Sequence, residues 1–279
     1  MTSSTPDALW SSLAVRYLHP AAVVCQRLRR RVGRANLLDG VDLKVPVGAR
    51  LLLVANPDAS ASLLLRVLAG LSRTDGGRFQ LAGALSSDIS TTGWARRIAY
   101  VGPDPGLFPW MSADETLALA ARLIGLERAD ARRLIDEAVE RWALSQGRDR
   151  PISRMGLAFM QRTSMAAALL GDPEVVLLDE PLRALEPRER ARLLRLPGER
   201  RTVVLSSRYP ASEAGIVDQV ALLQRGRVEL HVPISALEQL GLPLSMRSIE
   251  TLAGMLAVRR EAARRSAPMA KPAERRANA

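Results

Sequence analysis

Residues 171–187 read GDPEVVLLDEPLRALEP: a short loop, an apolar run that ends in two carboxylates, and a second loop. The apolar run over 175–178 consists of valine and leucine, which is typical of a strand buried on both faces of a sheet. Asp179 and Glu180 close this strand. Because the carboxyl ends of parallel strands line the ligand crevice of an open α/β sheet, these two carboxylates indicate where a ligand would bind.

Further apolar runs surround this stretch and alternate with segments of helical spacing. Strands are expected within LLDGVDLKVPVGARLLLV (37–54), DGGRFQLAG (75–83), RIAYV (97–101), TVVLSS (202–207), QVALLQ (219–224) and RVEL (227–230). Helices are expected within SLLLRVLAGL (62–71), 112–144 with a break near Gly125, FMQRTSMAAALLG (159–171), EPRERARLLRL (186–196), PASEAGIVD (210–218) and 246–265. Ser112 and Glu115 have the spacing of a capping box. The alternation predicts a mainly parallel sheet flanked by helices.

Composition places the chain among globular proteins. It has 279 residues, of which 47% are hydrophobic, enough for a sizeable core. Its single cysteine, Cys25, excludes an internal disulfide and fits a reducing compartment. The sequence shows neither a signal peptide nor a run of about 18 apolar residues, so a cytoplasmic location, at the membrane surface at most, is expected.

The charge is basic and comes almost entirely from arginine. The formal net charge is +11, and only Lys44 and Lys271 are lysines. From Arg259 onward there are seven basic and two acidic residues, while the basic residues of the body are interpreted as dispersed. Contact of the tail with anionic lipid or nucleic acid stays open, but a solvated, mobile end is favoured.

With these segments placed, residues 22–235 resemble the nucleotide-binding domain of ATP-binding cassette (ABC) transporters. The resemblance is carried by LLDGVDLKVPVGARLLLV, LLLRVLAGL, RIAYVGPDPGLFPWMSADETL and, above all, GDPEVVLLDEPLRALEP. It implies an ABC-type P-loop NTPase fold with an N-terminal antiparallel β part and a helical subdomain over about 103–165. A lead (1–21) and a C-terminal helix with a basic tail (236–279) would flank this domain.

The resemblance also implies that the phosphate loop has lost its chemistry. The family pattern Gly-Pro-Asn-Gly-x-Gly-Lys-Ser/Thr falls on residues 55–62, which read ANPDASAS. Asp58 and Ser60 stand at glycine positions, and Ala61 stands at the position of the lysine. Glycines let backbone amides surround phosphate oxygens, and the lysine adds positive charge beside them. Ala61 supplies no charge and Asp58 adds a negative one, so phosphate binding should be weakened by several kcal/mol.

Five other family positions have changed as well. Val32 stands where an aromatic residue would stack on adenine, and Pro103 stands at the Q-loop glutamine. Gly156 and Ala158 fall in the signature segment, in place of its serine hydroxyl and a second glycine. Arg208 stands at the switch histidine. The resemblance therefore predicts little or no ATP hydrolysis by this chain.

Three positions keep the family's chemistry. Asp179 and Ser62 would bind Mg²⁺, and Glu180 would be the general base for the attacking water. Each also has a plainer interpretation: the carboxylates as capping or ion-pairing residues at a strand end, and Ser62 as a hydroxyl at a helix N-terminus. ATP and Mg²⁺ are thus implied as cofactors by the family, and their binding to this chain is in doubt.

The segment GPDPGLFPWM (102–111) is the candidate docking surface. In the family this region contacts the coupling helices of the membrane subunits, and here it carries Phe108, Trp110 and Met111. The alternative is that Phe108 and Trp110 pack beneath the helical subdomain. The partners implied are membrane subunits and a second nucleotide-binding subunit, identical or different, and no nucleic acid is expected.

Three hypotheses about function follow. The leading one is an ABC transporter subunit at the cytoplasmic face of the membrane that acts as a pseudo-ATPase beside a competent partner. The second is an active ATPase that uses an arginine, such as Arg66 or Arg208, in place of the lysine. The third is a soluble interaction or nucleic-acid-binding protein that exploits the basic charge.

Overall fold

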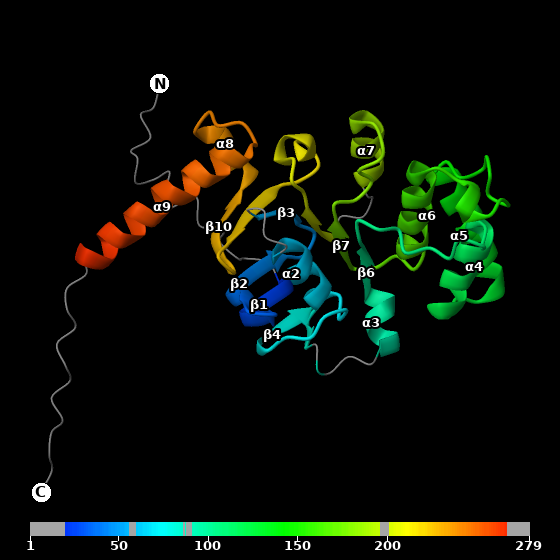
Figure 1. The fold of residues 1–279 in the computed structure, drawn as a ribbon, viewed down its shortest axis with the longest axis horizontal. Helices are drawn as coiled ribbons and strands as arrows, with labels where there is room; N and C mark the ends of the chain where they lie inside the picture. Colours follow the sequence, from blue (N-terminus) through cyan, green and yellow to red (C-terminus); the bar gives the residue numbers. More distant parts are fainter. Residues whose placement is uncertain (1–19, 56–59, 86, 88–90, 196–200, 267–279) are drawn as a thin grey trace, which may run out of the picture.

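Two β-sheets and a set of helices make up the computed structural model, which describes residues 20–55, 60–85, 87, 91–195 and 201–266. The larger sheet has the strand order β10-β9-β3-β8-β7-β6, and the smaller has the order β2-β1-β4-β5 (Figure 1). The strands of the larger sheet are β3 (Arg50–Ala55), β6 (Ile98–Val101), β7 (Val175–Asp179), β8 (Thr202–Ser206), β9 (Gln219–Gln224) and β10 (Arg227–Pro233). Those of the smaller sheet are β1 (Ala21–Val32), β2 (Ala35–Pro46), β4 (Gly76–Leu81) and β5 (Ala84–Leu85).

The larger sheet is parallel except at one edge, where β10 runs antiparallel to β9. Its central strands are buried on both faces, as their continuous apolar runs predict. Successive side chains of a strand point to opposite faces, so Leu51 and Leu53 belong to one hydrophobic cluster while Leu52 and Val54 belong to the other. This sheet therefore separates two cores.

The first core lies between the two sheets and contains α2 (Ser60–Leu68). Four apolar side chains of this helix are fully buried: Leu64, Leu65, Val67 and Leu68. The antiparallel strands β1, β2 and β4 cover it from the other side. The helix α3 (Thr91–Arg97) precedes β6, and its Trp94 meets Phe79 of β4 edge to face with ring centroids 5.9 Å apart.

The second core joins the opposite face of the larger sheet to a group of helices at one end of the molecule. These are α4 (Ala113–Leu123), α5 (Arg128–Arg141) and α6 (Leu157–Leu169), preceded by a 3₁₀ turn over Ile152–Arg154 (Figure 1). The predicted capping box is present, since the Ser112 hydroxyl accepts from the Glu115 N–H and the Glu115 carboxylate accepts from the Ser112 N–H. The predicted break near Gly125 lies between α4 and α5. The helix α7 (Pro187–Leu194) follows β7.

Two segments beyond β8 differ from the prediction. The helix expected over 210–218 is only a 3₁₀ turn, Pro210–Glu213, because the backbone is extended at Ala214 and left-handed at Gly215, with φ of +76°. A short helix that the sequence did not indicate, α8 (Ile234–Gln239), follows β10.

The predicted C-terminal helix is present as α9 (Met246–Ser266). Its first half packs against β9 and β10 through Ile249 and Leu252, and its second half projects from the body, leaving Met255 and Val258 exposed (Figure 1). Among the described residues, no helix is both long enough and apolar enough to cross a bilayer.

Candidate functional site

The carboxyl ends of β3, β7 and β8 meet at a cavity of about 350 Å³ next to the start of α2. The structure brings five residues that the sequence predicted to this one cavity: Ala61, Ser62, Pro103, Glu180 and Arg208. Each of them follows a strand or opens α2, so the parallel sheet places them together although they are far apart in sequence. Leu53, Ala55, Arg183, Ser206 and Ser207 complete the lining.

Asp179 lies behind this cavity and is almost completely buried, with 1% of its surface exposed. Its Oδ1 accepts hydrogen bonds from the hydroxyls of Ser62, at 2.9 Å, and Ser206, at 2.6 Å. Its Oδ2 accepts a longer one from the Tyr100 hydroxyl, at 3.5 Å. Burial of a carboxylate is tolerated only when such donors replace water, so these three hydroxyls account for the buried position of Asp179.

Tyr100 belongs to β6, and its hydroxyl group is affected by the same carboxylate, Asp179. Burial, then the charge of Asp179, raise the pKa of Tyr100 to about 12. The tyrosine thus stays protonated at neutral pH and remains a hydrogen-bond donor to Asp179.

Glu180 is held by Arg208. The carboxylate Oε1 accepts from the Arg208 backbone N–H at 3.0 Å and from its Nε at 3.1 Å. Glu180 is largely covered, with 17% of its side chain exposed, whereas Arg208 is 68% exposed. The ion pair occupies an oxygen that a general base would use to accept a proton from water.

The loop after Glu180 is fixed from beneath by two other helices. Gln161 of α6 accepts a hydrogen bond from the Ala184 N–H at 2.9 Å. Arg190 of α7 donates from Nε to the Pro181 carbonyl at 3.0 Å and forms a two-pronged ion pair with Glu213 at 2.8 and 2.9 Å. The Glu213 side chain has no exposed surface. These contacts hold the loop that brings Arg183 to the cavity.

The other predicted nucleotide-binding residues lie elsewhere. Ser60 is buried at the first position of α2, Val32 is 49% exposed at the end of β1, and Gly156 and Ala158 lie at the start of α6. None of these four lines the cavity. Asp58 lies outside the described residues.

The oxygen groups at the cavity fit a magnesium ion only in part. The Ser62 hydroxyl and the Asp179 carboxylate lie 2.9 Å apart, and both are oxygen ligands of the kind that Mg²⁺ prefers. Pro103, at the position where the resemblance would place a glutamine, lines the cavity and has no side-chain donor or acceptor to offer a metal ion. In the described part of the chain, no cluster of three or more His, Cys, Asp or Glu side chains could hold a metal.

The predicted docking segment is exposed. Phe108 and Trp110 are 49% and 70% exposed, and their rings stack at a tilt with centroids 5.2 Å apart. Packing beneath the helical subdomain, the alternative left open by the sequence, is therefore wrong for both rings. Met111 is half-buried at the end of the same segment, and its carbonyl accepts a hydrogen bond from the Ile152 N–H at 2.8 Å.

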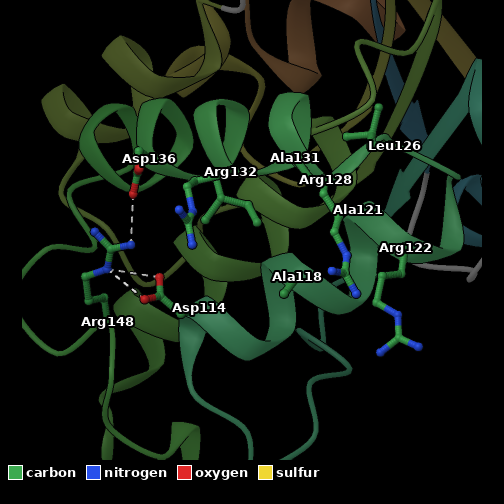
Figure 2. Close-up of a pocket in the computed structure, with 11 residues that line it drawn as sticks. Asp114, Ala118, Ala121, Arg122, Leu126, Arg128, Ala131, Arg132, Asp136 and Arg148 are labelled. Carbon is green, nitrogen blue, oxygen red and sulfur yellow. Dashed lines mark hydrogen bonds and ion pairs between the residues drawn. The ribbon is translucent and has the colours of Figure 1, made fainter.

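A second cavity, of about 610 Å³, lies between α4 and α5. At one end Arg148 bridges the two helices, contacting Asp114 at 2.8 Å and Asp136 at 3.0 Å (Figure 2). Ala118, Ala121 and Ala131 also line the cavity. Figure 2 shows Arg128 and Arg132 projecting from α5 toward α4.

Sequence reasoning missed the polar residues that support the site. Ser206 of β8 is the register partner of Asp179 of β7. Tyr100 belongs to β6, which pairs with the opposite edge of β7. The signal was available for Ser206, since it ends the apolar run TVVLSS just as Asp179 ends its own. Tyr100 sits inside an apolar run and carried no such signal.

Comparison with known proteins agrees with this architecture. The family model described as ABC transporter matches residues 38–183. The chain is 30% identical over 213 residues to the daunorubicin resistance ATP-binding protein DrrA3 of Streptomyces coeruleorubidus, a match that covers 74% of this chain and 66% of that protein. It is 30% identical to the aliphatic sulfonates import ATP-binding protein SsuB 1 of Pseudomonas fluorescens, covering 77% of this chain and 78% of the relative.

Solved structures show the same fold. The structure of an ATP-binding subunit of an ABC transporter superposes with a TM-score of 0.74 at 22% identity and covers 84% of this chain and 99% of that one. A dimeric ATP-binding cassette in a post-hydrolysis state with ADP and phosphate has a TM-score of 0.68 at 18% identity, covering 76% of this chain and 98% of that one.

Proposed function

The chain belongs to the ABC transporter family, and we propose that it is a nucleotide-binding-type subunit that no longer hydrolyses ATP. Within it we place the cassette at residues 22–235, with the helical subdomain at about 103–165 and a C-terminal helix and tail from 236. Its task would be to dock on membrane subunits at the cytoplasmic face of the membrane and to pair with a subunit that retains the chemistry.

This proposal rests on the residues found at two cavity positions where the family resemblance expects charged catalytic groups, a lysine and a general base. The side chain at the lysine position is the methyl group of Ala61, which is 9% exposed and lines the cavity. The carboxylate at the general-base position, Glu180, is bound to Arg208. Phosphoryl transfer depends on positive charge at the γ-phosphate and on an oriented water, and each requirement loses its residue here.

Pairing with a second subunit follows from the position of the signature segment. Gly156 caps α6 and does not line the cavity of its own chain, which agrees with a segment that serves a partner's site. A homodimer of this chain would have two impaired sites. A heterodimer with an intact subunit would also have two altered sites, one with this chain's phosphate loop and one with its signature segment. We favour it because one of these sites would keep an intact phosphate loop and general base from the partner.

Docking on membrane subunits is supported by two exposed features of the helical region. The aromatic pair Phe108 and Trp110 leaves large apolar rings in water, which is costly unless a partner covers them. The cavity between α4 and α5 is lined by alanines together with Arg128 and Arg132. A short amphipathic segment of a membrane subunit would fit the aromatic pair and this cavity.

The experiment is a steady-state ATPase assay of the purified chain, alone and in complex with the permease and cassette subunits with which it assembles. We expect no turnover by the chain alone, and no loss of the complex's turnover when this chain carries Glu180→Gln. Turnover by the isolated chain that disappears with Glu180→Gln would contradict the proposal.

One observation favours a second candidate, an ATPase that uses arginine. Arg183 and Arg208 both line the cavity and could supply the charge that Ala61 lacks. Arg66, the other arginine suggested by the sequence, does not line it. In this case, Arg183→Gln or Arg208→Gln would abolish Mg-ATP binding, whereas Arg66→Gln would not.

A further inference from the structure

The arginines of the body are not evenly spread. Five of them, Arg27, Arg29, Arg30, Arg31 and Arg34, fall within eight residues of the hairpin formed by β1 and β2. Two of the five, Arg27 and Arg29, line a cavity of about 750 Å³ on the antiparallel sheet, separate from the site at the carboxyl ends of the larger sheet. Gln26, Arg27, Arg29, Asp42, Asp75, Gly76, Gly77 and Arg78 line it.

A β-bulge in β1 shapes this cavity. Its pairing with β2 shifts between Cys25 and Leu28, and Arg27 adopts a φ of +49°, which is uncommon for a residue other than glycine. The Arg27 N–H leaves the ladder and donates to Asp42 at 2.9 Å. Opposite the bulge, a side chain at Gly77 would place its Cβ 2.3 Å from the Arg27 carbonyl oxygen, so only glycine fits there. The hollow is therefore fixed by the backbone of two strands.

The carboxylates at this cavity are already engaged. Asp75 accepts from the Arg30 side chain and from the Arg31 N–H, both at 2.7 Å. These hydrogen bonds, led by the one from the backbone, lower the pKa of Asp75. Asp42 accepts the bulge N–H.

Three arginines that line the cavity are not paired with a carboxylate in the described part of the chain. Within the described part of the chain, Arg27, Arg29 and Arg78 form no ion pair, and the Arg78 Nε donates instead to the Gln26 amide oxygen at 2.6 Å. These arginines come from two neighbouring strands, β1 and β4, and all three line the hollow. A concave site with three cations and occupied carboxylates is suited to a compact anion with several acceptor oxygens.

We propose that this cavity, lined by Arg27, Arg29 and Arg78, binds the phosphate groups of a phosphate-bearing small molecule. Guanidinium groups match phosphate oxygens with paired N–H donors. A continuous nucleic acid backbone fits less well, because Asp42 and Asp75 interrupt the basic lining. Soluble organic phosphates and the headgroups of anionic lipids share this chemistry, and separate measurements distinguish them.

The probe for the soluble source is pyrophosphate, titrated into the full chain by calorimetry in low salt with EDTA. The wild-type chain should bind it, and Arg29→Gln and Arg78→Gln should each weaken the affinity by about fivefold or more, since each removes one charge-assisted contact. Asp42→Asn keeps an acceptor for the Arg27 N–H and removes a negative charge, so it should tighten binding. Arg188→Gln, an equally exposed arginine on α7, is the matched control and should change nothing.

The probe for the lipid source is sedimentation with phosphatidylglycerol vesicles. Vesicle binding that Arg29→Gln and Arg78→Gln reduce, without pyrophosphate binding, would assign the site to headgroups. Binding of neither probe would overturn the proposal, as would an equal loss in Arg188→Gln. Duplex DNA that binds more tightly than pyrophosphate and depends on the same arginines would also overturn it, because the ligand would then be nucleic acid.

Discussion

Glu180 and Arg208 form an ion pair across the carboxyl ends of β7 and β8, with Nε and the backbone N–H of Arg208 both donating to Oε1 of Glu180, at 3.1 and 3.0 Å. The family resemblance places the general base at Glu180 and the switch histidine at Arg208, so the pair would join these two positions. An active site needs both groups free to meet a water molecule and a phosphate. Under the proposed function, this ion pair would hinder Glu180 from accepting a proton from water.

Releasing this pair should not restore hydrolysis. Arg208→His introduces the residue that the family resemblance places here and removes the ion pair to Glu180, leaving only the backbone N–H bond, but Ala61 still supplies no charge to a phosphate. We expect ATP turnover by Arg208→His to equal the background rate in a coupled assay. Arg183→His, which alters the other arginine of the cavity, is the control. Turnover appearing in Arg208→His alone would mean that the ion pair was the only block.

Breaking the buried pair of Arg190 and Glu213 by removing one partner should strongly destabilise the fold. Glu213 has no exposed surface, so Arg190→Met would leave a carboxylate buried without its partner. The expected loss in the free energy of unfolding is about 3–5 kcal/mol, measured by urea denaturation. The double variant Arg190→Met, Glu213→Met should lose clearly less, because no charge then stays buried. Equal losses in the single and double variants would refute this explanation.

His231 should make the protein less stable in mild acid. Burial lowers the pKa of His231 from 6.5 to about 4 in the folded chain. Between these values the unfolded chain binds a proton that the folded chain does not, so stability falls as the pH falls through this window. From pH 7 to pH 5 the contribution is about 2 kcal/mol. Urea unfolding at both pH values should show a smaller difference for His231→Gln than for the wild type, and an unchanged difference would contradict the assignment.

Trp110 should matter for assembly and not for folding. Its ring is 70% exposed, so Trp110→Ala should change the thermal unfolding midpoint by little. Co-purification with the membrane subunits should drop at least about tenfold, as expected when an aromatic anchor of an interface is removed. Leu123→Ala, an equally exposed apolar change on α4, tests whether any loss of surface has this effect. Co-purification that Trp110→Ala leaves intact would remove this residue from the docking surface.

The strands of the larger sheet could be predicted well from the sequence because they are continuous apolar runs that end in polar or turn residues. The run over 175–178 became β7, and the paired carboxylates at its end located the cavity. The helix expected over 210–218 failed because the backbone becomes extended at Ala214 and left-handed at Gly215, which the apolar spacing does not indicate.

Contacts between side chains distant in sequence could not be predicted. The ion pair of Glu180 and Arg208 spans 28 residues, and the hydrogen bond from Tyr100 to Asp179 spans 79. Such contacts depend on strand order, which apolar periodicity does not encode. The bulge at Arg27 was likewise invisible, since nothing in the residue types indicates where the ladder slips.

The central claim is that Ala61 and the loop before it no longer bind the phosphates of ATP, and calorimetry with Mg-ATP tests it most directly. The background variant Arg29→Gln, Arg78→Gln removes binding at the basic cavity, and the repaired variant adds Asp58→Gly and Ala61→Lys. We predict no binding heat up to millimolar ATP in the background variant, and measurable binding after repair. Micromolar binding in the unrepaired background variant would contradict the claim.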